Sequence, residues 1–588
     1  AHRMLTIKDP KGTVYLTNTY DTNGRVSKQT LADGGLYQFA YTLDASGKVT
    51  QTDVTAPRGI LRRVTFNASG YPLTDTRARS RTEQQSWSYT RDPTTNRLAS
   101  TTDPLGRMTA YEYDATGNVT KVTRLSGAAD AVAATYTYEP RYNQVASVTD
   151  PLGHTTRYDY DDRGNLVTAT DPLNQQDTFT FTYEGYLASA TDPLGHTALF
   201  DYDGGDLAGI TDPLGNRMTR FTDSTGRLVS VTDPLGNLSR LDYDALGRVA
   251  RATDPLGRVT QYAYDTNGNL TGVTDPRGGV TSYNYDAKDR PISRTDPLLK
   301  SESYTYDLDD NLASHTDRRG KVTKYTYDGL NRRTFAGYGA SGTTYASQVA
   351  YTYDAGDRLT QTLDSQSGTL TRSYDLLDRL TGETTPQGSV TYVYDKAGRR
   401  TGLTVAGQTQ VTYGYDDADR LTAISQGTAS VGYTYDDAGR RTGLTLPNGV
   451  TVAYGYDNAN RLTALTYKKG STVLGDLAYS YDPAGRRTAL AGSYARTGLP
   501  SALATTTLDA GNRLTAWAGK TLSYDANGNL TGDGTYTYTW DERNRLATIT
   551  NGSTTVASFA YDPFGRRTVK TVGATATGFL YDGLDLVQ

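Results

Sequence analysis

The sequence contains no cysteine among its 588 residues. That absence excludes disulfide bridges, thiolate zinc sites and cysteine nucleophiles. Aliphatic residues are also scarce, because the hydrophobic set is 36% of the chain and includes 47 tyrosines. Excluding tyrosine and adding the 60 glycines leaves about 38%, against about 45–50% in ordinary globular domains. The composition therefore favours an ordered fold with a thin or shared core over a stack of thick, two-layer cores.

An excess of one charge is missing as well. Lys and Arg number 60 and Asp and Glu 64, a formal net charge of -4, so the phosphate contacts that drive nucleic-acid binding are not expected. No run approaches the roughly 18 apolar residues of a membrane-spanning helix. The first residues, 1–6, lack the apolar core of a signal peptide. Balanced charges together with 10% aromatic residues also argue against disorder.

What the sequence has in abundance is one pair of residues, Tyr-Asp, repeated through the chain. Between residues 243 and 328 it recurs every 21 residues. A fixed period of this length is typical of a repeat protein, in which each unit packs on its neighbours. The repeat residues that we expect to be structurally decisive are Tyr243, Asp244, Gly247, Tyr264, Asp265, Gly268, Tyr285, Asp286, Tyr306, Asp307, Tyr327, Asp328, Tyr435, Asp436 and Gly439.

One unit of the repeat can be read as two turns and two strands. Asp244 can accept hydrogen bonds from the backbone ahead of it, and Gly247 can adopt the positive φ of a type I turn with a bulge. The second turn, Asp-Pro-Leu-Gly, begins at Asp254, with proline at its favoured second position. Side chains alternate over 249–253 and 259–264, which predicts strands. Each unit is therefore a β-hairpin, and successive hairpins continue an antiparallel meander.

Every unit carries the sequence Thr-x-Tyr-x-Tyr on the same face of its second strand. We therefore expect the rings of neighbouring units to stack as cross-strand ladders, each pair contributing roughly 0.2–1 kcal/mol. About 26 units would give roughly 50 strands, far more than the about 10 of an open twisted sheet. The predicted fold class is all-β, a long antiparallel sheet coiled into a spiral hollow shell. Successive turns of the coil are expected to pair edge to edge, which satisfies the strand rims.

Turn chemistry divides the chain into three parts of one continuous shell. Residues 1–100 carry degenerate repeats, 100–336 carry repeats with Asp-Pro-Leu-Gly turns, and 337–588 carry repeats with short turns. The spacing slips in four places, where we expect loops. These places are residues 124–135, 337–349, 467–477 and 488–508.

The repeat motif resembles that of a known family. Residues 435–441 read Tyr-Asp-Asp-Ala-Gly-Arg-Arg, and residues 353–359 read Tyr-Asp-Ala-Gly-Asp-Arg-Leu with one departure. They are similar to the RHS or YD repeats of bacterial polymorphic toxins, of the C components of insecticidal toxin complexes and of teneurins. The resemblance implies a secreted or cell-surface cocoon of spiralling β-sheet. Such a cocoon holds its own C-terminal toxin polypeptide unfolded or inactive until delivery, with secretion or delivery components as further partners.

The closing residues, 581–588, are similar to the stretch that precedes the RHS-associated core in that family. That core carries an Asp-Pro-x-Gly self-cleavage segment. The self-cleaving aspartates and the variable toxin are therefore not expected within this chain.

Histidines and acidic turns offer the ligand types that metal sites use. The four histidines are His2, His154, His196 and His315. Two of them, His154 and His196, fill the slot after Asp-Pro-Leu-Gly that Asn216 and Arg258 fill elsewhere, so a polar turn position explains them. Residues 265–269 and 525–529 mimic the front of a calcium loop. Where the loop requires a final Glu, however, they offer Pro276 and Tyr536, and aspartate capping its own turn is the better explanation.

Four arginine pairs could line an interior or bind an anion. They are Arg399-Arg400, Arg440-Arg441, Arg486-Arg487 and Arg566-Arg567. Strand alternation places the two members of each pair on opposite faces, which weakens any cluster. We therefore favour ion pairing with the turn aspartates.

Two functions are compatible with these patterns. The first is a container that sequesters a toxin polypeptide by steric enclosure. The second is a cell-surface adhesion or carbohydrate-recognition module, in which exposed tyrosine rings act as stacking platforms for sugars. We expect no enzyme, because no Ser-His-Asp spacing, phosphate loop or metal-binding helix stands out. No catalytic, cofactor-binding or metal-binding residue is assigned.

Overall fold

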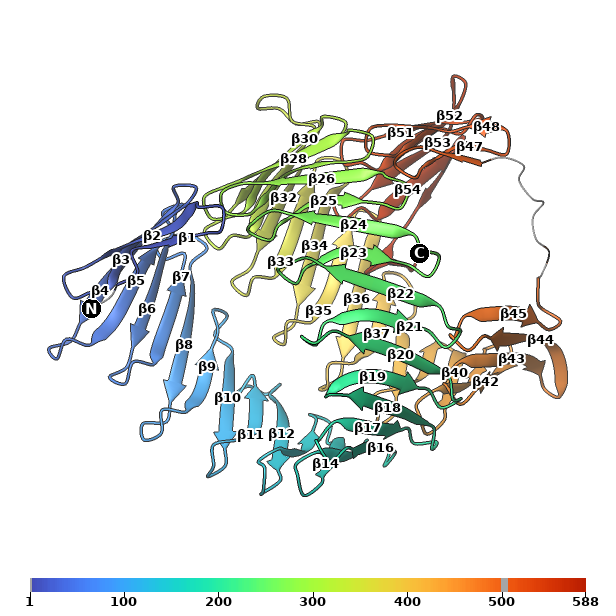
Figure 1. Cartoon of the computed structure of the whole chain (residues 1–588), viewed down its shortest axis with the longest axis horizontal. Coiled ribbons are helices and arrows are strands. Elements are labelled where there is room, and N and C mark those ends of the chain that lie inside the picture. The colour runs from blue at the N-terminus through green and yellow to red at the C-terminus, as the bar shows by residue number, and fades with distance from the viewer. Residues whose placement is uncertain (1–2, 497, 499–505) are drawn as a thin grey trace.

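The computed structural model describes residues 3–496, 498 and 506–588, and all of its regular structure is β-strand. Forty-five strands, from β1 (Thr6–Lys8) to β45 (Arg487–Ala491), form one antiparallel sheet in which each strand pairs with the next along the chain (Figure 1). No helix of the described residues is long and apolar enough to cross a membrane. The predicted all-β meander is confirmed.

The repeat unit folds as its sequence predicts. The two strands of the unit described above are β23 (Val249–Thr253) and β24 (Val259–Tyr264). Asp244 Oδ1 accepts hydrogen bonds from the backbone N–H of Leu246 at 2.9 Å and of Arg248 at 3.0 Å. Gly247 has a φ of 78°, in the left-handed region that a residue with a Cβ enters at a cost. Local chemistry thus fixes both ends of each hairpin.

The sheet is a wall one layer thick. Its accessible surface of 31634 Å² compares with about 20,000 Å² for a compact monomer of 63.8 kDa. In β24, Tyr262 and Tyr264 are half-buried on one face, whereas Gln261 and Ala263 are exposed on the other. The thin core expected from the composition is therefore present, and both faces of most strands meet solvent.

The ribbon is wound into a spiral shell (Figure 1). Because consecutive strands pair, both long edges of the ribbon consist of hairpin turns. One edge carries the Tyr-Asp turns and the other the Asp-Pro-Leu-Gly turns and their shorter equivalents. Winding places the second edge of one coil against the Tyr-Asp edge of the next, as Arg58 and Asp309 illustrate by meeting at 2.9 Å. Our expectation that strand rims would pair edge to edge is wrong, because turns and side chains make the junction.

The insertions behave differently from one another. A turn does separate β11 (Val119–Arg124) from β12 (Val132–Tyr138), as expected. Residues 467–477 were expected to form a loop, but they extend β43 (Leu462–Lys469) and β44 (Thr472–Tyr481) into longer paired strands. Of the slip at 488–508, residues 497 and 499–505 lie outside the described residues.

The C-terminal part continues as smaller sheets. Strands β46 (Thr506–Leu508) to β48 (Lys520–Thr521) form a three-stranded sheet, and β49 (Ser523–Tyr524) to β55 (Thr575–Gly578) form a seven-stranded one. The final hairpin pairs β56 (Tyr581–Asp582) with β57 (Asp585–Leu586). In the view of Figure 1 the C-terminus projects onto the middle of the molecule.

Candidate functional site

Each Tyr-Asp repeat is locked to the next by an arginine. Arg248 Nε donates to Asp244 Oδ2 of its own turn at 2.7 Å. Its Nη1 donates to the carbonyl oxygen of Asp265 in the next turn at 3.0 Å, and its guanidinium lies 4.6 Å from the ring centroid of Tyr264. The Tyr264 hydroxyl in turn donates to the carbonyl oxygen of Val249 at 3.0 Å. Neighbouring hairpins are therefore joined by a cation–π contact and charge-assisted hydrogen bonds in addition to the sheet ladder.

The predicted repeat residues occupy equivalent places in this arrangement. The six tyrosines donate to a carbonyl oxygen 14 or 15 residues earlier, at 2.6–3.0 Å; they are Tyr243, Tyr264, Tyr285, Tyr306, Tyr327 and Tyr435. Each aspartate accepts from the backbone N–H four residues later, at 2.9–3.0 Å; they are Asp244, Asp265, Asp286, Asp307, Asp328 and Asp436. Gly247, Gly268 and Gly439 all have positive φ. These residues shape the wall. Four of them are also contacted from the adjacent coil: Asp265 and Asp307 through their carboxylates, and Tyr327 and Asp328 through their carbonyl oxygens.

Tyrosine rings do not stack on one another in the manner that we expected. The sheet register places Leu270 opposite Tyr264 and Val273 opposite Tyr262. The next Tyr-Asp tyrosine lies two strands away, about 10 Å, which exceeds stacking distance. An arginine fills the intervening space instead. The contact of these arginines with the tyrosine rings escaped the sequence prediction, although their fixed place four residues after each aspartate was the available signal.

The expectation that the two members of each arginine pair lie on opposite faces is wrong, because Arg440 lies over Tyr456 and Arg441 over Tyr454, two tyrosines on one face of the same strand. The first member of each pair bonds to its own turn aspartate at 2.5–2.8 Å; these contacts are Arg399–Asp395, Arg440–Asp436, Arg486–Asp482 and Arg566–Asp562. The second member lies against an aromatic ring, as Arg441 does on Tyr433 with 4.7 Å to the centroid. Ion pairing with turn aspartates, the interpretation that we favoured, is confirmed.

Most contacts across the seams, the junctions between adjacent coils, join a basic or amide side chain to a turn of the opposite edge. Five contacts of this kind are Lys11–Asp265 at 2.7 Å, Arg58–Asp309 at 2.9 Å, Gln85–Asp357 at 2.6 Å, Arg107–Asp378 at 2.5 Å and Arg277–Asn512 at 2.6 Å. Burial raises the pKa of Asp265, but hydrogen bonds from Lys11 and Asn269 outweigh it and lower the pKa to about 2. These contacts keep the turns of adjacent coils together.

The most deeply buried charges hold the seven-stranded sheet onto the strands from β31 (Arg333–Tyr338) to β37 (Arg400–Val405). Arg543 donates through both Nη atoms to the two carboxylate oxygens of Asp364, each at 2.7 Å, and its Nε donates to Ser347 Oγ at 3.0 Å. The Arg543 and Asp364 side chains are 5% and 0% exposed. Arg566 makes a similar buried pair with Glu383 at 2.7 Å. The only sequence signal for these pairs was a charged residue, such as Asp364, that strand alternation places on the same face as the tyrosines.

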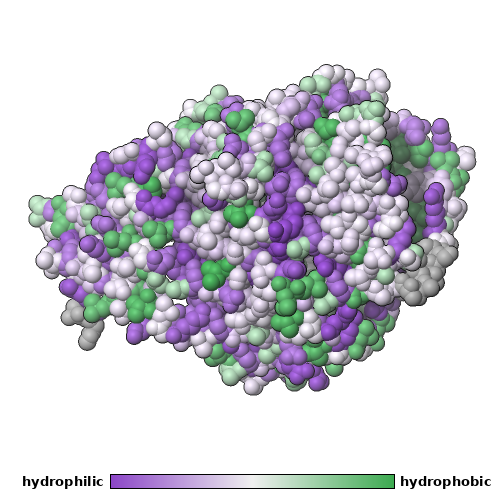
Figure 2. All heavy atoms as spheres, turned by 90° about the horizontal axis from the view of Figure 1, so that it is seen from above, coloured by the Kyte–Doolittle hydropathy of each residue, from purple (hydrophilic) through white to green (hydrophobic). Residues whose placement is uncertain are grey.

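A small apolar cluster lies beside these charges. Val390, Tyr392, Leu403 and Val405 from β36 (Gly388–Tyr394) and β37 (Arg400–Val405) enclose Leu580, which precedes the final hairpin. The C-terminal residues are thus packed on the same face of the wall as the buried arginines. Elsewhere on the face seen in Figure 2, polar and apolar residues are interspersed.

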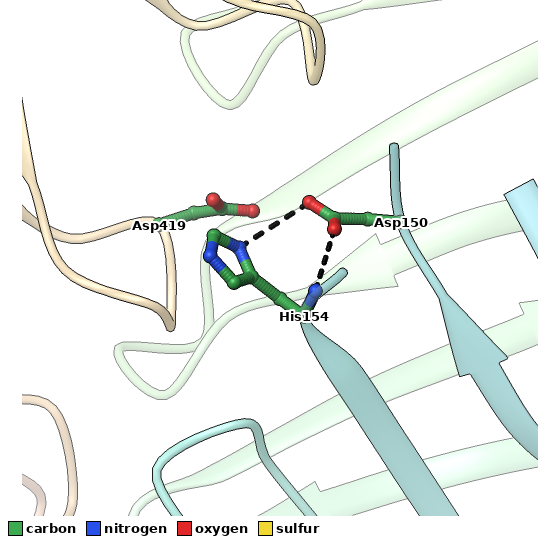
Figure 3. Close-up of side chains that lie close together, drawn as sticks. All are labelled: Asp150, His154 and Asp419. Carbon is green, nitrogen blue, oxygen red and sulfur yellow. Dashed lines mark hydrogen bonds and ion pairs between the residues drawn. The ribbon is translucent and has the colours of Figure 1, made fainter. Parts of the chain in front are cut away.

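Three histidines are described by the structure, and His2 lies outside the described residues. His196 Nδ1 lies 3.0 Å from Asp192 Oδ2 within its own turn. His315 stacks on Tyr304, with the ring centroids 5.0 Å apart. His154 lies between Asp150 of its own turn and Asp417 of the next coil, and its surroundings are drawn in Figure 3.

The aspartate-rich turns that mimic a calcium loop use their carboxylates internally. Asp265 accepts from the backbone and side chain of Asn269, and Asp525 does the same with Asn529. Within the described ranges, Asp150, His154 and Asp419 are the one group of ligand-type side chains whose atoms lie within 4.8 Å of one another. Within this group His154 Nδ1 lies 3.4 Å from Asp150 Oδ2 and Asp419 is exposed, and we assign no metal to it.

Comparison with known proteins gives a consistent picture. The family model described as "RHS Repeat" matches residues 91–129, 141–176, 223–259, 243–280, 264–298, 306–344, 374–410, 415–451, 435–472 and 540–577, more than half of the chain. The tRNA3(Ser)-specific nuclease WapA of Bacillus spizizenii and the tRNA nuclease WapA of Bacillus subtilis are 42% identical over 74 residues. That match covers 12% of this chain and 3% of theirs.

Two solved structures resemble the whole chain. The crystal structure of TcdB2-TccC3-Cdc42 is 14% identical, covers 95% of this chain and 40% of its own, and gives a TM-score of 0.48. The Photorhabdus luminescens Tc holotoxin pore is 15% identical, covers 94% and 30%, and gives 0.47. The chain thus spans less than half the length of the solved chains that it resembles.

Proposed function

The chain belongs to the RHS repeat family, and from that premise we propose that its coiled sheet is the wall of a container for a toxin polypeptide. The observation that carries the proposal is the pair of edges that meet turn to turn. A one-layer ribbon encloses space only if successive coils are held together, and contacts such as Arg58–Asp309 and Arg107–Asp378 do this. In this proposal the described residues act by steric exclusion and not by catalysis.

The position of the C-terminal residues supports the same function. Leu580 is 4% exposed and is packed among β36 and β37, so the end of the chain is held against the wall. A cargo attached after Gln588 would therefore start close to the tyrosine-bearing face. Secretion or surface display, with delivery components as partners, is the setting that we propose for such a container.

Protease protection tests the proposal. A protease-sensitive, unfolded reporter is fused after Gln588, and the same reporter is fused before Ala1 as the matched control. We expect the C-terminal reporter to survive at least about tenfold longer than free reporter, because cleavage then requires opening of the wall. Digestion of the C-terminal reporter at the rate of free reporter would reject enclosure.

A sugar-binding role has less support. The motif tyrosines are half-buried, and many are covered by arginine, as Tyr264 is by Arg248. The most exposed of the large aromatic residues, Tyr183 at 82%, itself lies under Arg163 with 4.5 Å from guanidinium to ring centroid. A glycan array probed with the chain checks the alternative, and specific binding there would favour recognition over enclosure.

A further inference from the structure

One stretch of the seam has carboxylates on both sides. There the turns beginning at Asp150, Asp171 and Asp192 face the Tyr-Asp turns of the next coil across a cleft of about 620 Å³. The acidic residues that line it are Asp150, Asp171, Asp177, Asp192, Asp417, Asp419 and Asp437. Arg420 also lines the cleft, but its Nε already donates to Asp416 at 2.8 Å.

Carboxylates crowd one another even on one side of the cleft. The pKa of Asp177 is raised, first by burial and then by Asp192 and Asp171 of the same edge. Elsewhere, as at Arg107 and Asp378, a permanent positive charge crosses the seam. No lysine lines this cleft among the residues described.

His154 is the side chain that crosses this stretch. Its Nε2 lies 3.3 Å from Asp417 Oδ1 of the next coil. Its Nδ1 lies 3.4 Å from Asp150 Oδ2, and Figure 3 shows this pair with the nearby Asp419. The imidazole is 18% exposed. The other contact that crosses the cleft is a weak one, from Asn460 Nδ2 to Asp192 Oδ2 at 3.5 Å.

The chain contains a permanently charged counterpart of His154. Arg107 fills the same slot, directly after Asp-Pro-Leu-Gly, and bonds to both its own Asp103 and Asp378 of the next coil. Asp378 and Asp419 likewise occupy the same position of their Tyr-Asp turns. The two seam contacts differ in two respects: His154 meets Asp417 instead of the aspartate equivalent to Asp378, and arginine stays charged whereas histidine changes charge between pH 5 and 8.

We propose that His154 forms a pH-sensitive contact that holds two coils of the wall together. When protonated, it supplies the positive charge that Asp150, Asp417 and Asp419 lack, and the stretch closes. When it loses its proton to solvent, the facing carboxylates repel and the stretch loosens. The charged form is the one that binds, so the stabilisation is present at acidic pH and is lost as pH rises past neutrality.

The carboxylates set the lower limit of this effect. Besides its two partners, Asp150 and Asp417, His154 shares the cleft with Asp171, Asp177, Asp192, Asp419 and Asp437, while Arg420 is engaged by Asp416. Carboxylates in general lose their charge as pH falls toward about 4, and Asp177 does so at a higher pH because its pKa is raised. The contact therefore acts above that range and weakens where an imidazole gives up its proton, between pH 5 and 8.

Spin labels placed on both sides of the cleft test the proposal. The chain has no cysteine, so Gln175→Cys and Ala438→Cys, which line the cleft from opposite edges, can be labelled specifically. We expect the population with a long label-to-label distance to rise about threefold to fivefold between about pH 5.5 and pH 8. This threefold to fivefold change is the size expected from the loss of one partly exposed ion pair.

Three variants of the labelled protein sharpen the test. His154→Asn keeps the turn, since Asn216 bonds to Asp212 in the same slot at 2.8 Å, and is expected to show the open population at both pH values. His154→Arg imitates Arg107 and is expected to stay closed at both. His196→Asn, which changes the same slot two repeats later, is expected to keep the wild-type response.

Three results would overturn the proposal. The first is a pH response that persists unchanged in His154→Asn, since the response then belongs to another group. The second is closure that disappears when EDTA removes divalent ions at pH 5.5, since a metal ion would then hold the two coils together. Equal distances at both pH values in the parent protein would also reject it.

Discussion

Breaking the buried pair between Arg543 and Asp364 should release the C-terminal sheet from the wall. Both side chains are almost fully buried, and the two hydrogen bonds between them are 2.7 Å long. In Asp364→Ala the guanidinium remains buried without its counter-charge. Leaving one member of a buried pair alone costs about 3–5 kcal/mol. The exposed pair Arg217–Asp201, whose side chains are 50% and 51% exposed, is the matched control, because such pairs contribute about 0–1 kcal/mol.

Hydrogen exchange measured by mass spectrometry reads the effect locally. Strands β51 (Thr537–Trp540) and β52 (Leu546–Asn551) flank the turn that carries Arg543. Protection of their amides should fall by about two to three and a half orders of magnitude in Asp364→Ala, since 1.4 kcal/mol is a factor of ten. Asp201→Ala should change the protection of its own strand less than about fivefold.

A double variant separates loss of the pair from loss of packing. Asp364→Leu combined with Arg543→Met removes both charges and keeps apolar volume, so most of the protection should return. A fall of less than tenfold in Asp364→Ala, or a double variant as weak as the single one, would refute the reasoning. In either case the buried charges would not be what holds the sheet.

Further predictions concern the hydrogen bonds, turns, seams and acid response. Tyr264→Phe keeps the ring under Arg248 but removes the bond to Val249, and should lower local stability by about 1 kcal/mol in exchange of β23 and β24. Gly257→Ala meets no atom within 4 Å but sits at a φ of 76°, so exchange of the same hairpin should report a loss of about 1–2 kcal/mol; no loss would mean that the turn relaxes. Arg58→Met should expose the turn at Asp309 to proteolysis, and unchanged cleavage there would contradict the seam assignment. Acid should detach the C-terminal sheet: burial raises the pKa of Asp364, but hydrogen bonds from Arg543 lower it overall. This contribution is complete above about pH 4 and is lost as pH falls through the lowered value, which Trp540 fluorescence can follow.

Local features of the fold could be predicted from the sequence because each hairpin is specified within its own residues. Side-chain alternation defined β23 and β24, and the aspartate and glycine of each turn fixed where the strands end. The same holds for the repeat residues of the wall, whose contacts lie at fixed distances along the chain. A contact 15 residues away, such as that of Tyr264 with Val249, belongs to one period of the pattern.

Contacts between coils could not be predicted in this way. Arg58 and Asp309 are 251 residues apart, and nothing in the spacing of the repeat says how many hairpins complete one coil. The ring-stacking prediction failed for a related reason. Alternation gives the face on which Tyr264 lies, but the residue that covers its ring depends on the reach of Arg248 from the preceding turn. Likewise, the insertion at 467–477 lengthened a hairpin because both sides could continue their pairing.

The circumference of each coil depends on which turns meet across the seam, because the repeat itself does not fix how many hairpins complete one coil. Gln85 and Asp357, which face each other across one seam, are 272 residues apart, whereas Asp364 and Arg543 are separated by 179. The second separation crosses the interval between β45 and β46, which belong to separate sheets, so it does not measure a turn of the continuous sheet. Within that sheet Arg58–Asp309 and Gln85–Asp357 are 251 and 272 residues apart, so the coil keeps nearly the same circumference between these two seams.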